Sequence, residues 1–363
     1  MFKSYLMGGF ECSTHLNPFQ TRVDIIAATK HDEFAEKDYQ TLLDFGMRTA
    51  RDGIRWHLIE KKPFEHDFSS VLNQVRSAKK TGIQTIWDLF HYGYPNDLDI
   101  FSPEFLERFT RFTKAFTEFL LNEDDRILFV CPINEISFFA WAAAEVGIFH
   151  PYQKHRGDEL KRQLVRASIS AIDEIRNLSP NARFVQAEPA IEVSTTSRNP
   201  RVISDTKNYR ESQFQAFDML AGKIEPELGG GEKYLDIIGI NYYSNNQWFH
   251  PSGRRILLGN KRYRPFNKIL REYYERYKCP MIVAETGIED EKRPAWFKYI
   301  YEQTEIAKNQ GIPIHGICLY PIFNHPGWDD NRHCYNGLWD YPNENGEREI
   351  YKPLADEIRK LIR

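Results

Sequence analysis

The sequence predicts the α/β class, and within it a single (β/α)₈ TIM barrel that spans residues 1–363. Eight short apolar runs alternate with amphipathic segments along the chain, an order typical of parallel strands joined by helices. Eight such units close a barrel, and 363 residues fit the length of a barrel with inserted loops. Because no linker, repeat or low-complexity tract divides the chain, we expect one domain.

The predicted strands are the eight apolar runs. They span residues 5–12, 49–56, 83–90, 127–134, 182–190, 236–243, 280–287 and 315–323. Helical spacing is clearest after the third run, where the capping sequence Ser102-Pro103-Glu104 precedes phenylalanines three or four residues apart. These are Phe105, Phe109, Phe112 and Phe116. We expect longer loops near residues 151–158, 194–209 and 325–347.

An open, doubly wound sheet is the alternative architecture, and it would bind a nucleotide. No G-x-G-x-x-G or G-x-x-x-x-G-K-[ST] sequence follows any run, and the glycine triplet at 229–231 precedes the sixth strand as a loop. The 48 basic and 51 acidic residues give a net charge of −3 without a basic patch. We therefore expect neither nucleic acid nor a membrane surface as a partner.

The five cysteines are scattered and form no C-x-x-C pair, so we expect reduced thiols, most of them in the core. No H-x-x-x-H or H-E-x-x-H pattern occurs, and neither a metal nor another cofactor is expected. The N-terminal residues lack the apolar region of a signal peptide, and no stretch approaches the length of a membrane span. We expect a cytoplasmic location. The sequence makes no prediction of the oligomeric state.

Two glutamates, Glu135 and Glu285, follow or end buried strand-like runs. A carboxylate is costly in a core, but it is acceptable where a strand leaves the sheet into a cleft, and burial there raises its pKa. The carboxyl ends of all barrel strands lie on one face, so the two side chains are expected to converge. Paired carboxylates at that face are the groups that glycoside hydrolysis uses. The alternative is a structural role as a helix cap or ion-pair partner.

The sequences around both glutamates resemble motifs of glycoside hydrolase family 1, which belongs to clan A of the retaining (β/α)₈ glycosidases. I-N-E at 133–135 resembles the family's T-[FL]-N-E-P, with Ile136 at the proline. A-E-T-G at 284–287 resembles [IV]-T-E-N-G, with Thr286 at the asparagine. The resemblance implies that Glu285 is the nucleophile and Glu135 the acid/base.

Three further motifs extend the resemblance over nearly the whole chain. D-I-I-G-I-N-Y-Y-S at 236–244 is close to D-F-[IL]-G-[IL]-N-Y-Y-[ST], R-D-G-I-R-W at 51–56 resembles R-F-S-I-S-W, and L-F-H-Y at 89–92 resembles L-x-H-W. The resemblance implies that Arg51 and Tyr243 hold the nucleophile; a core ion pair and a packing ring are the alternatives. The implied substrate-binding residues are His15, His91, Asn134, Asn241, Tyr320 and Trp328.

The sequence departs from the family pattern at two positions whose residues bind the sugar in the family. His15 stands where the family has a glutamine, and Gly327 stands where it has a glutamate. We therefore expect weak discrimination at the sugar's 4- and 6-positions. The following Asp329, Asp330, Arg332 and His333 either supply substitute contacts or form a solvated loop.

The resemblance implies a retaining hydrolase of the β-glucosidase or β-galactosidase type, which cleaves an equatorial β-glycosidic bond of a small oligosaccharide or glycoside. Carbohydrate is then the partner, and the two carboxyl groups are expected to lie about 5 to 5.5 Å apart. A barrel that binds glycans without cutting them is one alternative. A transglycosidase that uses the same residues is another.

Overall fold

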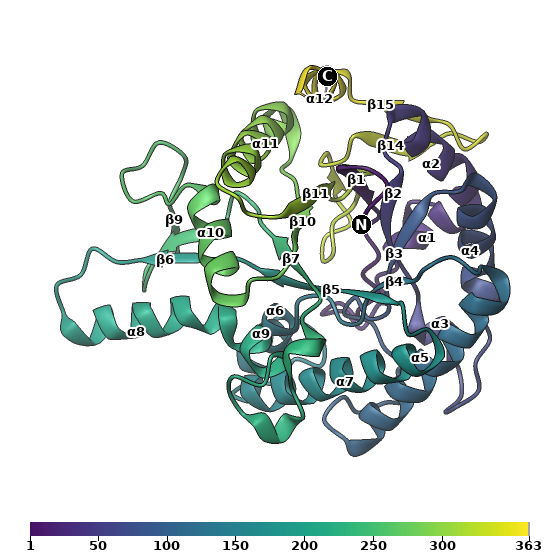
Figure 1. The fold of residues 1–363 in the computed structure, drawn as a ribbon, viewed down its shortest axis with the longest axis horizontal. Coiled ribbons are helices and arrows are strands. Elements are labelled where there is room, and N and C mark those ends of the chain that lie inside the picture. The colour runs from purple at the N-terminus through teal and green to yellow at the C-terminus, as the bar shows by residue number, and fades with distance from the viewer. Residues whose placement is uncertain (362–363) are drawn as a thin grey trace.

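The computed structural model describes residues 1–361 and contains a closed barrel of eight parallel strands inside a ring of helices (Figure 1). The barrel strands are β1 (Leu6–Gly9), β2 (Thr49–Gly53), β3 (Gln84–Asp88), β4 (Phe129–Cys131), β5 (Arg183–Pro189), β7 (Ile237–Asn241), β10 (Met281–Thr286) and β11 (Ile314–Leu319). All eight predicted strands are confirmed. Each strand is shorter than its apolar run, because the last residues of the run already turn into the loop above the barrel.

The barrel closes because β1 pairs with both β2 and β11: Met7 lies opposite Thr49 on one side and opposite Cys318 on the other. Apolar side chains fill the interior, and they come from alternate positions of the strands. They are Met7, Ile86, Phe129, Cys131, Val185, Ala187, Ile237, Ile282, Ala284, Cys318 and Tyr320. The same alternation directs Arg51, Asp88 and Asn241 inward at the carboxyl end, so that the top layer of the interior is polar.

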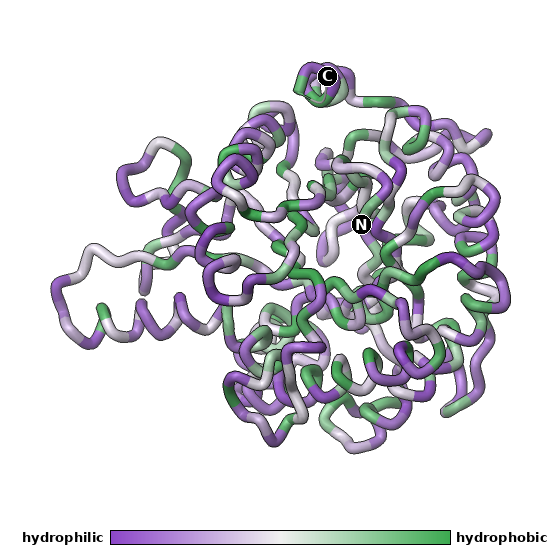
Figure 2. The backbone as a smooth tube through the Cα atoms, in the orientation of Figure 1, coloured by the Kyte–Doolittle hydropathy of each residue, from purple (hydrophilic) through white to green (hydrophobic). Residues whose placement is uncertain are grey.

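The helices of the ring pack apolar side chains against the outside of the barrel. Figure 2 shows hydrophobic and hydrophilic residues alternating along these helices. The helices are α1 (Ile25–Ala28), α2 (His31–Phe45), α3 (Trp56–Ile59), α4 (Ser69–Thr81), α5 (Pro103–Glu123), α6 (Ile136–Ala140), α7 (Gly157–Leu178), α8 (Pro200–Glu211), α9 (Gln215–Leu220), α10 (Phe266–Tyr277), α11 (Arg293–Asn309) and α12 (Lys352–Leu361). A π-helical turn follows α6 (Trp141–Glu145), and short 3₁₀ turns occur at Ser212–Phe214, Pro226–Leu228, Glu232–Tyr234 and Asp290–Lys292.

Helix α5 confirms the phenylalanine pattern, because the four predicted residues are fully buried on its inner face. Ser102 stands at the N-cap and Pro103 in the first turn, as expected. The Ser102 hydroxyl, however, donates to the Asp99 carbonyl at 2.7 Å and does not cap the helix.

One expected loop is wrong. Residues 194–209 are mostly helix α8, which begins at Pro200 after Asn199 caps its first turn by accepting from the Arg201 amide at 2.9 Å. Helix α8 projects from the ring beside a small sheet of β6 (Glu192–Ser194), β8 (Gln247–Phe249) and β9 (Arg254–Arg255) (Figure 1).

The other two expected loops are confirmed near residues 151–158 and 325–347. The second of them carries short strands: β12 (His325–Pro326) pairs with β13 (His333–Cys334), and β14 (Trp339–Pro342) pairs with β15 (Arg348–Ile350).

All five cysteines are free thiols, four of them buried and Cys279 half-buried, as expected. Within residues 1–361, the model contains no helix with the length and apolar character needed to cross a membrane.

Candidate active site

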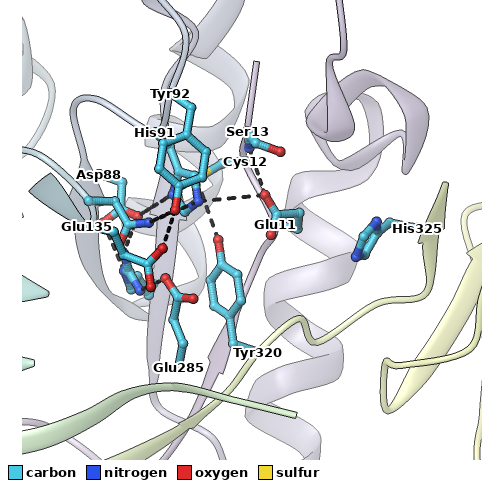
Figure 3. A network of polar contacts seen from close by, with 12 residues as sticks. Glu11, Cys12, Ser13, Asp88, His91, Tyr92, Glu135, Glu285, Tyr320 and His325 are labelled. Atoms are coloured by element: carbon cyan, nitrogen blue, oxygen red, sulfur yellow. Dashed lines mark hydrogen bonds and ion pairs between the residues drawn. The ribbon is translucent and has the colours of Figure 1, made fainter. Parts of the chain in front are cut away.

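Glu135 and Glu285 meet at the carboxyl end of the barrel, and Figure 3 shows their carboxyl groups facing one another. Glu135 follows β4 and begins α6, and its backbone amide donates to the Ala187 carbonyl of β5 at 2.9 Å. Glu285 lies on β10, where the pairing with β7 shifts register between Val283 and Glu285. Such bulges re-aim side chains next to active sites. Both glutamates are nearly buried, at 8% and 4% exposed.

The Glu285 carboxylate accepts from a cation and from a phenol. Arg51 Nη1 donates to Oε1 at 2.7 Å, and the Tyr243 hydroxyl donates to Oε2 at 2.8 Å. Arg51 is fully buried and also holds Asp88, through Nε at 2.9 Å and Nη2 at 2.7 Å. One guanidinium therefore lies between two carboxylates.

Burial and neighbouring charges act on the pKa of Glu285. Burial raises it, the charges of Arg51 and His91 lower it, and those of Glu135 and Glu11 raise it; the net shift is upward, to about 7.

The Glu135 carboxyl group contacts only neutral donors within residues 1–361. The Tyr92 hydroxyl donates to Oε2, and Asn241 Nδ2 donates to Oε1 at 2.9 Å. Glu135 and Tyr92 both have left-handed backbones, with φ of 50° and 68°. This conformation costs a non-glycine residue on the order of 1–3 kcal/mol and is concentrated at functional sites.

Asn134 and His91 connect the two carboxyl groups to the rest of the site. Arg51 Nη2 donates to Asn134 Oδ1 at 2.6 Å, which orients the amide so that Nδ2 faces His91 Nε2 at 3.2 Å. The other ring nitrogen, Nδ1, lies 3.1 Å from Asp88 Oδ2. Burial lowers the pKa of His91, but the hydrogen bond to Asp88 and the charge of Glu11 outweigh it and raise the pKa above its ordinary value.

Cys12, Asp88 and His91 offer three ligand atoms within 4.8 Å of one another, a grouping that could hold a metal ion. The sequence spacing does not reveal it. The Asp88 carboxylate already pairs with the Arg51 guanidinium, and burial raises the pKa of the Cys12 thiol well above its ordinary value. A protonated thiol beside a neutralised carboxylate fits a hydrogen-bonded cluster better than a metal centre.

The remaining predicted binding residues differ in their surroundings. The His15 ring stacks on Phe149 at 4.3 Å and meets the edge of Trp328 at 5.6 Å, and burial lowers its pKa to about 3. Trp328 in turn lies 6.0 Å from the Tyr92 ring. Tyr320 is a packing ring of the barrel interior, only 1% exposed, with the Arg51 guanidinium 5.3 Å over its face.

Several buried polar atoms at this end of the barrel have no hydrogen-bond partner within residues 1–361. They are Ser13 Oγ, His15 Nδ1, His15 Nε2, Asn241 Oδ1 and Trp328 Nε1. Buried polar groups are nearly always paired. Their clustering next to two buried carboxyl groups therefore indicates a binding site for a ligand rich in donors and acceptors.

The structure brings most of the predicted residues into one hydrogen-bonded network. Its predicted members are Arg51, His91, Asn134, Glu135, Asn241, Tyr243 and Glu285. The sequence analysis missed Glu11, Asp88 and Tyr92. The available signals were a carboxylate inside an apolar run for Asp88 and the position directly after His91 for Tyr92.

Comparison with solved structures identifies the fold over the full chain. A family 1 β-glucosidase from Thermotoga maritima superposes with a TM-score of 0.79 at 14% identity, over 100% of this chain and 98% of that one. The virulence factor SghA, solved with its substrate analogue salicin, gives 0.79 at 16% identity over 98% and 95%. A mutant hyperthermophilic β-glucosidase gives 0.75 at 16% identity over 98% of each chain.

No protein-family model and no curated protein sequence matches the chain. At identities of 14–16% the structural likeness establishes the fold. The chain thus has the (β/α)₈ fold of the family 1 β-glucosidases from its first barrel strand to its last, as the sequence motifs predicted.

Proposed function

We propose that the chain is a retaining glycoside hydrolase that cleaves a β-glycosidic bond. The observation that supports this most directly is the unequal pair of buried carboxyl groups: Glu285 contacts the Arg51 cation, whereas Glu135 contacts neutral donors. A cation favours the ionised form of its partner. We infer from this asymmetry that Glu285 acts as the carboxylate and Glu135 as the proton donor.

These two states are the ones that double displacement requires. Glu285 attacks the anomeric carbon and forms a covalent glycosyl-enzyme, while Glu135 gives its proton to the departing oxygen. Glu135 then accepts a proton from the incoming water, which releases the sugar. Tyr243 and Arg51 each occupy one oxygen of Glu285 and so fix its plane for attack.

The unpartnered polar atoms and the aromatic rings around the pair support a sugar as the substrate. Hydroxyl groups donate and accept, so a sugar can satisfy His15, Asn241 and Trp328 Nε1 together. The solved relatives in fold are β-glucosidases, one of them in complex with glucoimidazole. This supports the β-linkage and the choice of β-glucosides and β-galactosides as the first substrates to test.

Variants of the two glutamates, assayed with substrates that have good and poor leaving groups, test the roles of the two carboxyl groups separately. Glu135→Ala should slow hydrolysis of unactivated glycosides about 10²- to 10⁴-fold, because these need a proton on the leaving oxygen, and should slow activated aryl glycosides far less. Azide should restore turnover of the activated substrate and yield a β-glycosyl azide. Glu285→Ala should be nearly inactive on both substrates, and Glu118→Ala, on the exposed face of α5, serves as the control.

Full activity of Glu135→Ala on an unactivated glycoside, or equal responses of the two variants, would contradict this division of roles. Product analysis with and without an acceptor sugar tells hydrolysis from transglycosylation. Sugar binding without turnover of any glycoside would instead indicate a non-hydrolytic barrel.

A further inference from the structure

Glu11, two residues beyond the end of β1, is a buried carboxylate that the proposed chemistry does not use. It is 8% exposed. Its Oε1 accepts from the Ser13 amide at 2.9 Å and lies 3.7 Å from His91 Nε2. Within residues 1–361, no donor reaches the second oxygen, Oε2. A buried carboxylate with a free oxygen is available to a ligand.

The charge of Glu11 is preserved by its surroundings. Burial raises the pKa of Glu11, but the charges of His91 and His325 and the hydrogen bond from Ser13 outweigh it and lower the pKa below its ordinary value. His325 forms no hydrogen bond to the Glu11 carboxylate, since its Nδ1 lies 2.7 Å from the Pro326 carbonyl and its Nε2 lies 2.9 Å from Asn336 Nδ2. Glu11 is thus an ionised acceptor.

Glu11 lies across His91 from the reacting carboxyl groups. Figure 3 shows Glu135 and Glu285 on one side of the His91 ring and Glu11 on the other. A sugar whose anomeric carbon lies between Glu135 and Glu285 therefore presents its remote hydroxyls toward His91 and Glu11.

The loop after β11 does not supply a carboxylate there. A side chain at Gly327 would meet Asp330 Oδ1 at 2.1 Å from its Cβ. Asp330 is exposed and accepts from the Arg332 amide, and Arg332 forms a two-pronged ion pair with Glu289 at 2.6 and 2.7 Å. Asp330 and Arg332 are thus engaged in contacts at the surface.

Strand pairing explains how the first strand can take over this contact. β1 and β11 are hydrogen-bonded neighbours, with Gly8 opposite Leu319. The segments that follow the two strands therefore rise over the same sector of the barrel. A carboxylate on the segment after β1 can therefore reach the same sugar hydroxyls as a carboxylate on the segment after β11.

We propose that Glu11 is the specificity-determining residue of this site, accepting hydrogen bonds from sugar hydroxyls remote from the anomeric carbon. The inference rests on the proposed glycosidase function and names its substrate class: neutral β-glycosides with free remote hydroxyls. A carboxylate or phosphate at that position would be repelled by Glu11. Gly327 and His15 led us to expect weak discrimination at the sugar's 4- and 6-positions. With Glu11 as an acceptor, we expect strong discrimination between sugars that differ in their remote hydroxyls.

The test combines changes in the enzyme with changes in the sugar. Aryl glycosides of the best substrate are prepared in 3-deoxy, 4-deoxy and 6-deoxy forms, and kcat/KM is measured for the natural chain, Glu11→Gln and Glu11→Ala. In the natural chain, removing the hydroxyl held by Glu11 should lower kcat/KM about 10- to 100-fold, as expected for a hydrogen bond to a charged acceptor. In Glu11→Ala the same deletion should cost less than about threefold, because the contact is already lost.

Two comparisons sharpen the test. Asp330→Asn, the matched change in the rival loop, should leave the deoxy penalties as they are in the natural chain. A substrate that carries a carboxylate in place of its C6 hydroxymethyl group should be disfavoured by the natural chain and improved, relative to the neutral parent, by Glu11→Gln.

Each outcome bears on the role of Glu11, on the proposed hydrolase activity, or on both. Deoxy penalties that are equal in the natural chain and the Glu11 variants, or that change in Asp330→Asn instead, overturn the role of Glu11 while hydrolysis stands. Calorimetric binding of the same sugars gives a readout without turnover: binding that depends on Glu11 in a chain that cleaves no glycoside overturns the hydrolase and keeps the role of Glu11. Neither binding nor cleavage overturns both.

Discussion

Removing the hydroxyl of Tyr243 tests how its hydrogen bond affects the pKa of Glu285. Tyr243→Phe removes the donor to Glu285 Oε2 at 2.8 Å, the single one within residues 1–361, and leaves the Arg51 contact to Oε1 in place. The ring is retained, so packing changes little. Because the lost hydrogen bond favours the ionised form of Glu285, its removal raises the pKa of that carboxyl group.

The size of the effect follows from the type of hydrogen bond. A bond to a charged group contributes about 1.5–3 kcal/mol, and one pKa unit corresponds to about 1.4 kcal/mol. Tyr243→Phe should therefore move the acidic limb of the kcat/KM profile upward by about 1 to 2 pH units. The measurement is a pH profile with an activated aryl glycoside, for which proton donation by Glu135 matters least.

The neighbouring Tyr242 provides a matched control. Its hydroxyl lies outside the barrel, 2.9 Å from the Tyr263 hydroxyl, and accepts from Gln247 at 2.7 Å. Tyr242→Phe should lower the unfolding free energy by about 1 kcal/mol through loss of neutral hydrogen bonds and leave the acidic limb unmoved. An unchanged limb in Tyr243→Phe, or the same shift in both variants, would refute the assigned role of Tyr243.

Two further predictions concern geometry and stability. A crystal structure should place the carboxyl groups of Glu135 and Glu285 about 5 to 5.5 Å apart; a separation near 9 Å would favour inversion. Burial lowers the pKa of His31, but Asp38 and Asp52, at 2.8 and 2.9 Å from its ring nitrogens, outweigh it and raise the pKa to about 9. Protonated His31 should contribute fully to the free energy of unfolding below its unfolded pKa of about 6.5, and this contribution should be lost as the pH rises through 9. Urea unfolding should therefore show a fall in stability near pH 9. In His31→Gln this fall should be smaller.

The sequence predicted the barrel because its signals are local and repeated. Eight apolar runs occur in order, and each is long enough to predict a strand without knowledge of the strands that it pairs with. The network around Glu285 was predictable for a related reason: Arg51 points inward from β2, and Asn134, Asn241 and Tyr243 stand at or just beyond strand ends, where the fold alone brings side chains together.

Sequence position offered a signal for Asp88 and Tyr92, but the backbone geometry that directs Tyr92 and Glu11 into the site has no sequence pattern. Tyr92 reaches Glu135 from a left-handed backbone, with φ of 68°, after the strand has ended. Glu11 is directed by a hydrogen bond from the amide of Ser13, two residues further along the chain. The error over residues 194–209 has another origin, because polar residues obscured a helix whose start, Asn199-Pro200, is itself a recognisable capping signal.

The two ends of the site are under different physical constraints, which explains why one matches the family pattern and the other does not. In the proposed reaction, charge develops at fixed atoms, so the groups proposed to supply and balance it, Glu135, Glu285 and Arg51, must keep their places. At the remote end, a sugar hydroxyl requires only an acceptor at the right point, whichever strand carries it. Because β1 and β11 are adjacent, the role proposed for Glu11 would place beyond β1 a carboxylate that Gly327 does not provide beyond β11. Specificity can thus be rebuilt from a neighbouring strand while the reaction is unchanged.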